Sequence, residues 1–220
     1  MNKELWFSTV KLLIFDLDGT LFKSDEANIE AIKRAIKRID LNISVDDQYL
    51  RGLLGLPSPD FYKLILPEDK QDKWQMLQKT TREEYQITIR EMGKLYPDVK
   101  ETLSILNSRR YVLAIYSNSS VNYFNTAVND LGIRTYFKYA ECSEEYNITK
   151  IALVHKIMDA FSNVKTAVIG DRFNDYEAAK DNNALSVGVL YGYGKEEPYK
   201  ADITIKKFSD LLDIFKGIEA

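Results

Sequence analysis

The chain has 220 residues, of which 45% are hydrophobic and 29% are charged, with a net charge of -3. This length predicts a self-sufficient core that buries roughly 70% of the unfolded surface, in one large domain or one domain with an insertion. The nearly balanced charge gives no basic surface for nucleic acid or an anionic membrane, so we expect small partners. Cys142 is the only cysteine, which excludes an intramolecular disulfide and a cysteine-rich zinc site.

The expected location is the cytoplasm. A single cysteine fits a reducing compartment. No apolar run reaches the ~18 to 20 residues of a membrane span, and residues 1–9 lack the apolar centre of a signal peptide. His155, the only histidine, lies in the helix-like segment 151–161, where we expect it to pack. If the protein is an enzyme, its catalytic acid and base are then expected to be carboxylates.

Residues 10–21 read VKLLIFDLDGTL and predict a buried strand that ends in a turn. An apolar run too short for a typical helix stops at two acids, Asp16 and Asp18, followed by Gly19. Ligands of open α/β sheets bind beyond the carboxyl ends of the strands, so these acids are the first candidates for chemistry. Taken alone, the same pattern is also typical of a strand that ends in a polar turn.

Residues 22–95 predict helices and no convincing strand. We expect an amphipathic helix up to about residue 40, short helices on both sides of the loop 52–59, and a long polar helix over about 68–92. From Tyr96 onward, short apolar strands alternate with helices, which indicates a parallel sheet. The expected organisation is a doubly wound α/β core domain at 1–21 and 96–220, with a helical cap domain at 22–95.

Three further segments of the second half carry polar groups where a strand ends or a helix begins. A strand at 111–116 runs into Ser117 and Asn118 before a helix, which predicts either an anion site or a simple helix cap. Lys150 begins a later helix, where a solvated lysine is the ordinary expectation. A strand at 166–170 ends in acids at positions 171 and 175, which fit either a divalent cation or the dipole of the next helix. The remaining strands are expected at 136–142, 184–190 and 202–205.

These segments together resemble the four motifs of the haloacid dehalogenase superfamily, in the expected order and over nearly the whole chain. They are the run FDLDGTL at 15–21, Ser117-Asn118, Lys150, and the pair Asp171 and Asp175 behind Gly170. The helical insertion resembles the C1-type cap of the phosphoglycolate phosphatase and β-phosphoglucomutase branch. Within that cap, the loop 54–58 is the candidate for contact with substrate.

The resemblance implies a Mg²⁺-dependent phosphatase that acts on a small phosphorylated metabolite through an aspartyl-phosphate. Asp16 is then the nucleophile and Asp18 the general acid and base. The expected metal ligands are the Asp16 side chain, the Asp18 backbone carbonyl and Asp171, with Asp175 as an outer partner. Ser117, the backbone of Asn118 and Lys150 are expected to bind the phosphate. Lys150 is also expected to favour the ionised form of Asp16.

The sequence differs from family patterns at two positions, and two functions other than a phosphatase also fit its residues. The proline often found soon after the lysine of the third motif is missing here, so Lys156 is an alternative to Lys150. Dehalogenases usually carry an aromatic residue where this chain has Asp18, which argues against dehalogenation. A phosphomutase would use the same residues, and a response-regulator-like signalling domain also has a phospho-accepting aspartate. The identity of the substrate and the oligomeric state stay open.

Overall fold

The computed structural model describes residues 9–54, 56, 59–162 and 164–217. The chain divides into two compact units. One unit comprises Met1–Lys23 and Leu95–Ala220, and the other comprises Ser24–Lys94. The functional assignment of these units as a catalytic core and a cap, expected at 22–95, stays a prediction. Among the described residues, no helix has both the length and the apolar character needed to cross a membrane.

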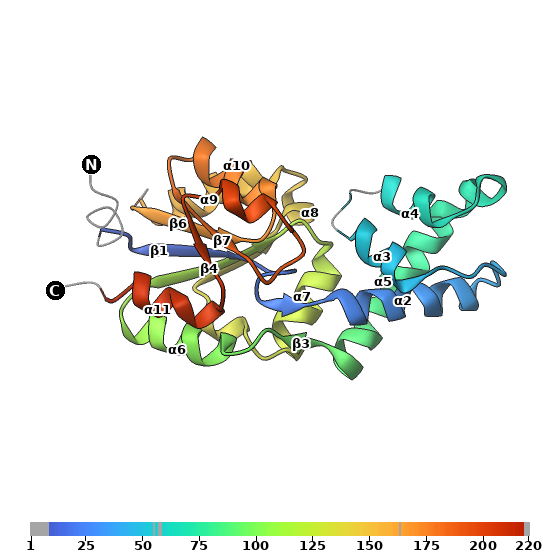
Figure 1. Cartoon of the computed structure of the whole chain (residues 1–220), viewed down its shortest axis with the longest axis horizontal. Coiled ribbons are helices and arrows are strands. Elements are labelled where there is room, and N and C mark those ends of the chain that lie inside the picture. The colour runs from blue at the N-terminus through green and yellow to red at the C-terminus, as the bar shows by residue number, and fades with distance from the viewer. Residues whose placement is uncertain (1–8, 55, 57–58, 163, 218–220) are drawn as a thin grey trace. The chain divides into compact units, whose positions relative to one another are not determined.

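The first unit is built on a parallel six-stranded sheet, which confirms the predicted α/β class (Figure 1). The strand order is β5-β4-β1-β6-β7-β8. The chain leaves β1 for β4 on one side and later returns to β6 on the other, so β1 lies at the point where the strand order reverses. The strands are β1 (Leu12–Asp16), β4 (Val112–Ser117), β5 (Tyr139–Cys142), β6 (Thr166–Gly170), β7 (Leu185–Val189) and β8 (Ile203–Ile205).

Helices cover both faces of this sheet (Figure 1). On one face, apolar side chains of α9 and α10 pack on those of β1, β4 and β6. On the other face, Phe15 of β1 contacts the rings of Phe137 and Phe208. The helices and helical turns of the unit are α6 (Val99–Ser108), α7 (Val121–Asp130), η2 (Arg134–Tyr136), α8 (Ser143–Tyr146), α9 (Lys150–Ala160), α10 (Phe173–Asp181), η3 (Glu197–Lys200), η4 (Phe208–Asp210) and α11 (Leu211–Ile214).

The register of the sheet brings polar strand ends together. Every residue of β1 is buried, and the strand ends at Asp16. Asp16 lies opposite Tyr116 of β4, and Phe15 lies opposite Ile169 of β6. The residues that follow each of these strands therefore meet at the same edge, which is where open parallel sheets bind ligands.

The second unit is helical and has its own apolar core, formed by residues such as Ile32, Leu50, Phe61 and Leu77. Its elements are α2 (Asp25–Arg38), α3 (Asp47–Leu53), α4 (Asp60–Ile65), η1 (Glu68–Lys73) and α5 (Trp74–Met92). Two short strands where the chain passes between the units, β2 (Phe22–Lys23) and β3 (Lys94–Leu95), form a two-stranded sheet. The loop predicted to contact substrate falls largely on Gly55, Pro57 and Ser58, which lie outside the described residues.

The sequence predicted no convincing strand over 22–95, but this range begins and ends with the short paired strands β2 and β3. Three other sequence predictions also need correction. The long helix does not begin near Glu68, because residues 68–73 form the 3-10 turn η1, which has no buried side chain to pack. The strand predicted from Tyr136 begins only at Tyr139, since residues 134–136 form the turn η2. His155 does not pack: its side chain is 65% exposed and lies 3.6 Å from Asp159.

Candidate active site

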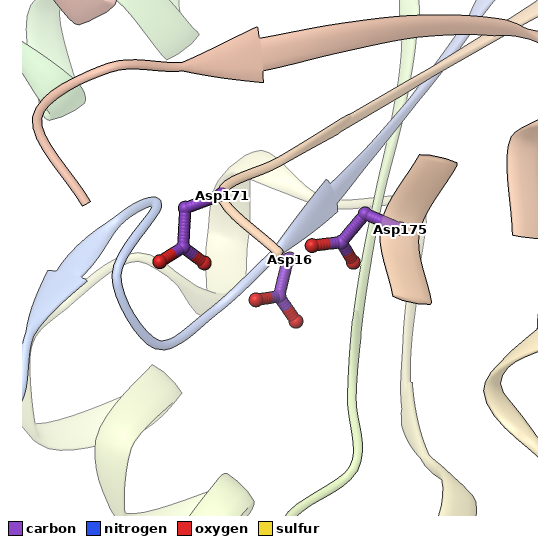
Figure 2. Close-up of side chains that lie close together, drawn as sticks. All are labelled: Asp16, Asp171 and Asp175. Atoms are coloured by element: carbon purple, nitrogen blue, oxygen red, sulfur yellow. The ribbon is translucent and has the colours of Figure 1, made fainter. Parts of the chain in front are cut away.

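Three buried carboxylates gather at the carboxyl edge of the sheet (Figure 2). Asp16 ends β1, Asp171 follows β6, and Asp175 lies in the first turn of α10. One carboxylate oxygen from each lies within 4.8 Å of the other two. The three residues are at most 5% exposed. Three oxygen donors this close together form a set that suits a hard divalent cation such as Mg²⁺.

Both carboxylate oxygens of Asp175 accept hydrogen bonds from other protein groups. Its Oδ1 accepts a hydrogen bond of 2.5 Å from the Tyr116 hydroxyl and lies 2.5 Å from the Lys150 ammonium. Its Oδ2 accepts a hydrogen bond of 3.1 Å from the backbone N–H of Arg172. Protein groups therefore hold this carboxylate in place. This is expected of a residue that orients the metal ligands without binding the metal directly.

Asp171 differs because one of its oxygens has no hydrogen-bond partner among the described residues. Its Oδ2 accepts a hydrogen bond of 2.6 Å from the backbone N–H of Tyr193. Its Oδ1 is buried and has no hydrogen-bond partner in the part of the chain that the structure describes. A buried polar atom without a partner is costly, so this oxygen fits a direct metal ligand.

The electrostatics of the cluster also fit a cation. Burial raises the pKa of Asp171 to about 7, with a further contribution from Asp175, although the Tyr193 N–H acts in the opposite direction. Burial likewise raises the pKa of Asp16 well above its ordinary value, and Asp175 and Asp171 add to this effect. Lys150 lowers the pKa of Asp16, as expected from the sequence, but does not outweigh burial. A bound cation favours the charged forms of both acids.

Glycines allow the backbone to approach Asp171 closely. Gly19 has a φ of +78°, in the region that favours glycine, and a Cβ placed on it would overlap the Asp171 carboxylate. A Cβ on Gly192 would overlap the Asp171 side chain, and one on Gly194 would overlap its backbone carbonyl. The turn after β1 and the loop after β7 therefore enclose Asp171 from two sides.

Lys150, and not Lys156, lies at the strand end. The Thr149 hydroxyl accepts a hydrogen bond of 3.2 Å from the Ala152 N–H and so begins α9 with Lys150 as its first residue. The Lys150 ammonium donates a hydrogen bond of 2.8 Å to Asp16 Oδ1. Burial alone would lower the pKa of Lys150, but Asp16 and Asp175 together raise it, so the side chain stays a cation. Lys156 instead pairs with Glu141, at 2.7 Å.

The remaining predicted residues flank this cluster. Asp18 is half-buried, and its Oδ1 accepts a hydrogen bond of 2.5 Å from the Tyr123 hydroxyl. Ser117, at the end of β4, is buried, and its hydroxyl oxygen accepts a hydrogen bond of 3.0 Å from the Ser119 N–H. The exposed Asn118 accepts a hydrogen bond of 2.9 Å from the Ser143 hydroxyl through its side chain.

Sequence reasoning missed three tyrosines that touch this site. The Tyr116 hydroxyl bonds Asp175, Tyr123 bonds Asp18, and the Tyr193 backbone holds Asp171. The alternation of tyrosine and glycine after β7 was a signal for close backbone approach at a strand end. Tyr116 and Tyr123 carried no such signal, because aromatic residues in a strand or on a helix face also fill cores.

Comparisons with known proteins identify the family of the chain. A family model described as haloacid dehalogenase-like hydrolase matches residues 13–189. A phosphoglycolate phosphatase of Vibrio vulnificus strain YJ016 is 29% identical over 223 aligned positions, which cover 93% of this chain and 96% of the relative.

Solved structures share the fold over nearly the full length. A crystal structure from Haemophilus somnus 129PT, described as a predicted phosphoglycolate phosphatase, has a TM-score of 0.82 and 25% identity, with 94% of this chain and 98% of that chain covered. The structure of CbbY from Rhodobacter sphaeroides in complex with phosphate has a TM-score of 0.75, 17% identity, and coverage of 94% and 99%, and it shows the fold alone. The family match spans most of the chain and includes the strand ends described above. The chain therefore belongs to the haloacid dehalogenase-like hydrolases.

Proposed function

We propose that this hydrolase is a Mg²⁺-dependent phosphatase that acts on a small phosphorylated metabolite through an aspartyl-phosphate on Asp16. The observation that carries the proposal is the buried pairing of Asp16 with Lys150, at 2.8 Å, beside Asp171. One oxygen of Asp171 has no hydrogen-bond partner within the described part of the chain. The relative named phosphoglycolate phosphatase supports the choice of a phosphoric ester as substrate.

The first chemical step transfers the phosphoryl group to the protein. A carboxylate oxygen of Asp16 attacks phosphorus and forms a new O–P bond, while the ester O–P bond breaks. Asp18 gives its proton to the leaving oxygen, so the product departs as an alcohol rather than an alkoxide. Asp16 and Asp18 thus take different tasks, although only Leu17 separates them.

The second step returns Asp16 to its starting state. Asp18, now a carboxylate, accepts a proton from water as the water oxygen attacks phosphorus. The bond between Asp16 and phosphorus breaks, and inorganic phosphate leaves. The buried Lys150 cation, Ser117 and the backbone of Asn118 would bind the remaining phosphate oxygens, where they offset negative charge in the transition state.

The residues that would hold Mg²⁺ are the Asp16 side chain, the Asp18 backbone carbonyl and Asp171, with Asp175 orienting them. When bound, Mg²⁺ supplies positive charge that favours the ionised carboxylates and reduces their repulsion with phosphate. Oδ1 of Asp171 supports this assignment, because no described residue hydrogen-bonds to it. The occupied oxygens of Asp175 support its place as an outer partner.

Asp171→Asn should raise the Mg²⁺ concentration needed for half-maximal activity more than Asp175→Asn does. Asparagine keeps the volume of each buried side chain, so both variants should fold. Loss of an outer partner typically costs ~10 to 100-fold in affinity or activity, and loss of a direct ligand should cost more. Metal titrations that gave the reverse order would exchange the two assignments. Full activity in excess chelator would discard the metal.

Mg²⁺ should bind more weakly as the pH falls from 8 to 6. The pKa of Asp171 is raised to about 7 without metal, so this carboxyl holds a proton below that pH, and Mg²⁺ must displace it. Competition with one proton lowers the apparent affinity by up to ~10-fold per pH unit below the pKa. Calorimetric titration at both pH values measures this change, with circular dichroism as the control for folding. An affinity that stays constant across the range would contradict the raised pKa.

Release of inorganic phosphate from a panel of metabolites tests the proposed function. The panel should include 2-phosphoglycolate, sugar phosphates and nucleotides, each with Mg²⁺ and with chelator. We expect Mg²⁺-dependent release from at least one alkyl monoester. Transfer of phosphate to a second sugar hydroxyl without release would identify a mutase instead. A phosphorylated protein that persists for minutes without turnover would favour the signalling alternative.

A further inference from the structure

Tyr123 lies against the proposed general acid. It is the third residue of α7, the residue is 5% exposed, and its hydroxyl donates a hydrogen bond of 2.5 Å to Asp18 Oδ1. A tyrosine hydroxyl that donates a hydrogen bond to one oxygen of a carboxyl group restricts the orientation of that group. The position of the Asp18 carboxyl is therefore coupled to a buried side chain of another element.

The backbone at Asp18 is also linked to Tyr123, through Phe22. The Gly19 N–H donates a hydrogen bond of 3.0 Å to the carbonyl of Phe22, and an isolated bridge joins Asp18 to Phe22. The Phe22 ring in turn packs on the Tyr123 ring, with centroids 6.4 Å apart. The Tyr123 ring thus contacts the residue that closes the turn, while its hydroxyl binds the acid that the turn carries.

We propose that Tyr123 is a positioning residue that orients the Asp18 carboxyl for proton transfer to the leaving oxygen. This inference rests on the proposed phosphatase function and deepens it. Because the Tyr123 hydroxyl donates to Oδ1, the proton that Asp18 delivers is carried on Oδ2. The proton passes from Oδ2 to the departing ester oxygen as the O–P bond breaks, and the Tyr123 hydroxyl keeps its own proton throughout.

This role makes a prediction that depends on the leaving group. An alkyl phosphate needs proton donation, since its alkoxide is a poor leaving group. In p-nitrophenyl phosphate the phenolate leaves without help. The ratio kcat/KM reports only the steps up to phosphoryl transfer, so it isolates the acid role of Asp18 from its later role as a base.

The test compares Tyr123→Phe with the parent enzyme, using the best alkyl monoester of the panel and p-nitrophenyl phosphate. The variant should lose roughly 10 to 100-fold in kcat/KM for the alkyl ester, a cost typical of one lost hydrogen bond, and less than about threefold for the aryl ester. Tyr111→Phe is the matched control. Tyr111 is 4% exposed, precedes β4 at its other end, and accepts a hydrogen bond from the Gly217 N–H.

A double-mutant cycle tests the same coupling. If Tyr123 acts through Asp18, Tyr123→Phe should change kcat/KM less than about twofold in the Asp18→Asn background. Equal losses on both esters, no loss on either, or a gain on the alkyl ester would overturn the inference and leave the phosphatase proposal intact. A parent enzyme that hydrolyses no phosphate ester would instead remove the proposed function, and the inference with it.

Discussion

Asp16→Asn is expected to abolish phosphate release while the protein stays folded. An amide matches the carboxylate in size but does not attack phosphorus, so kcat should fall by a factor on the order of 10⁴ or more. Asparagine keeps the volume of the buried side chain, and Lys150 keeps its ion pair with Asp175, so the protein should stay folded. Measured kcat and thermal unfolding of the purified variant check both points.

Asp159→Asn provides the matched control for this change. Its carboxylate is 51% exposed and lies on α9 beside His155, so full activity is expected. If folded Asp16→Asn protein kept more than a few per cent of the parental rate, another group would have to be the nucleophile.

Asp18→Asn is expected to slow turnover by a factor of about 10² to 10⁴, the usual size of general acid and base catalysis. Both steps lose their proton carrier, so kcat should fall on alkyl and aryl esters alike. In kcat/KM, however, the alkyl ester should lose more than p-nitrophenyl phosphate. A variant that hydrolyses alkyl esters at the parental rate would show that the proton comes from elsewhere.

The sheet could be predicted from the sequence because its central strands are short, wholly buried runs that stop at polar residues. Every residue of the run before Asp16 and of the run before Gly170 is buried, and Thr166 is the one polar residue in these two runs. The carboxyl ends of parallel strands lie at one edge of the sheet. This rule predicts from the sequence that Asp16 and Asp171 lie close together. The fold prediction is confirmed, whereas the chemical roles of these residues stay predictions until they are measured.

The contacts of helix residues were harder to predict, because they depend on which face of each helix packs against the rest of the protein. His155 lies on the exposed face of α9, since Leu153, Val154 and Ile157 take the buried positions. Residues 68–73 carry no apolar side chain and therefore form a 3-10 turn rather than the first turns of a helix. The bond between Tyr123 and Asp18 joins residues far apart in the sequence, and helical periodicity does not specify such a contact.

Trapping the phosphoryl group on the protein tests the mechanism most directly. Asp18→Asn protein should transfer phosphate from p-nitrophenyl phosphate but hydrolyse the intermediate slowly, because the base that activates water is missing. The measurement is peptide mass spectrometry after mixing with Mg²⁺ and substrate and quenching in acid. The expected result is one added phosphoryl group on Asp16. A phosphoryl group on another residue, or product release from this variant with no protein-bound phosphate at any time, would contradict an aspartyl-phosphate at Asp16.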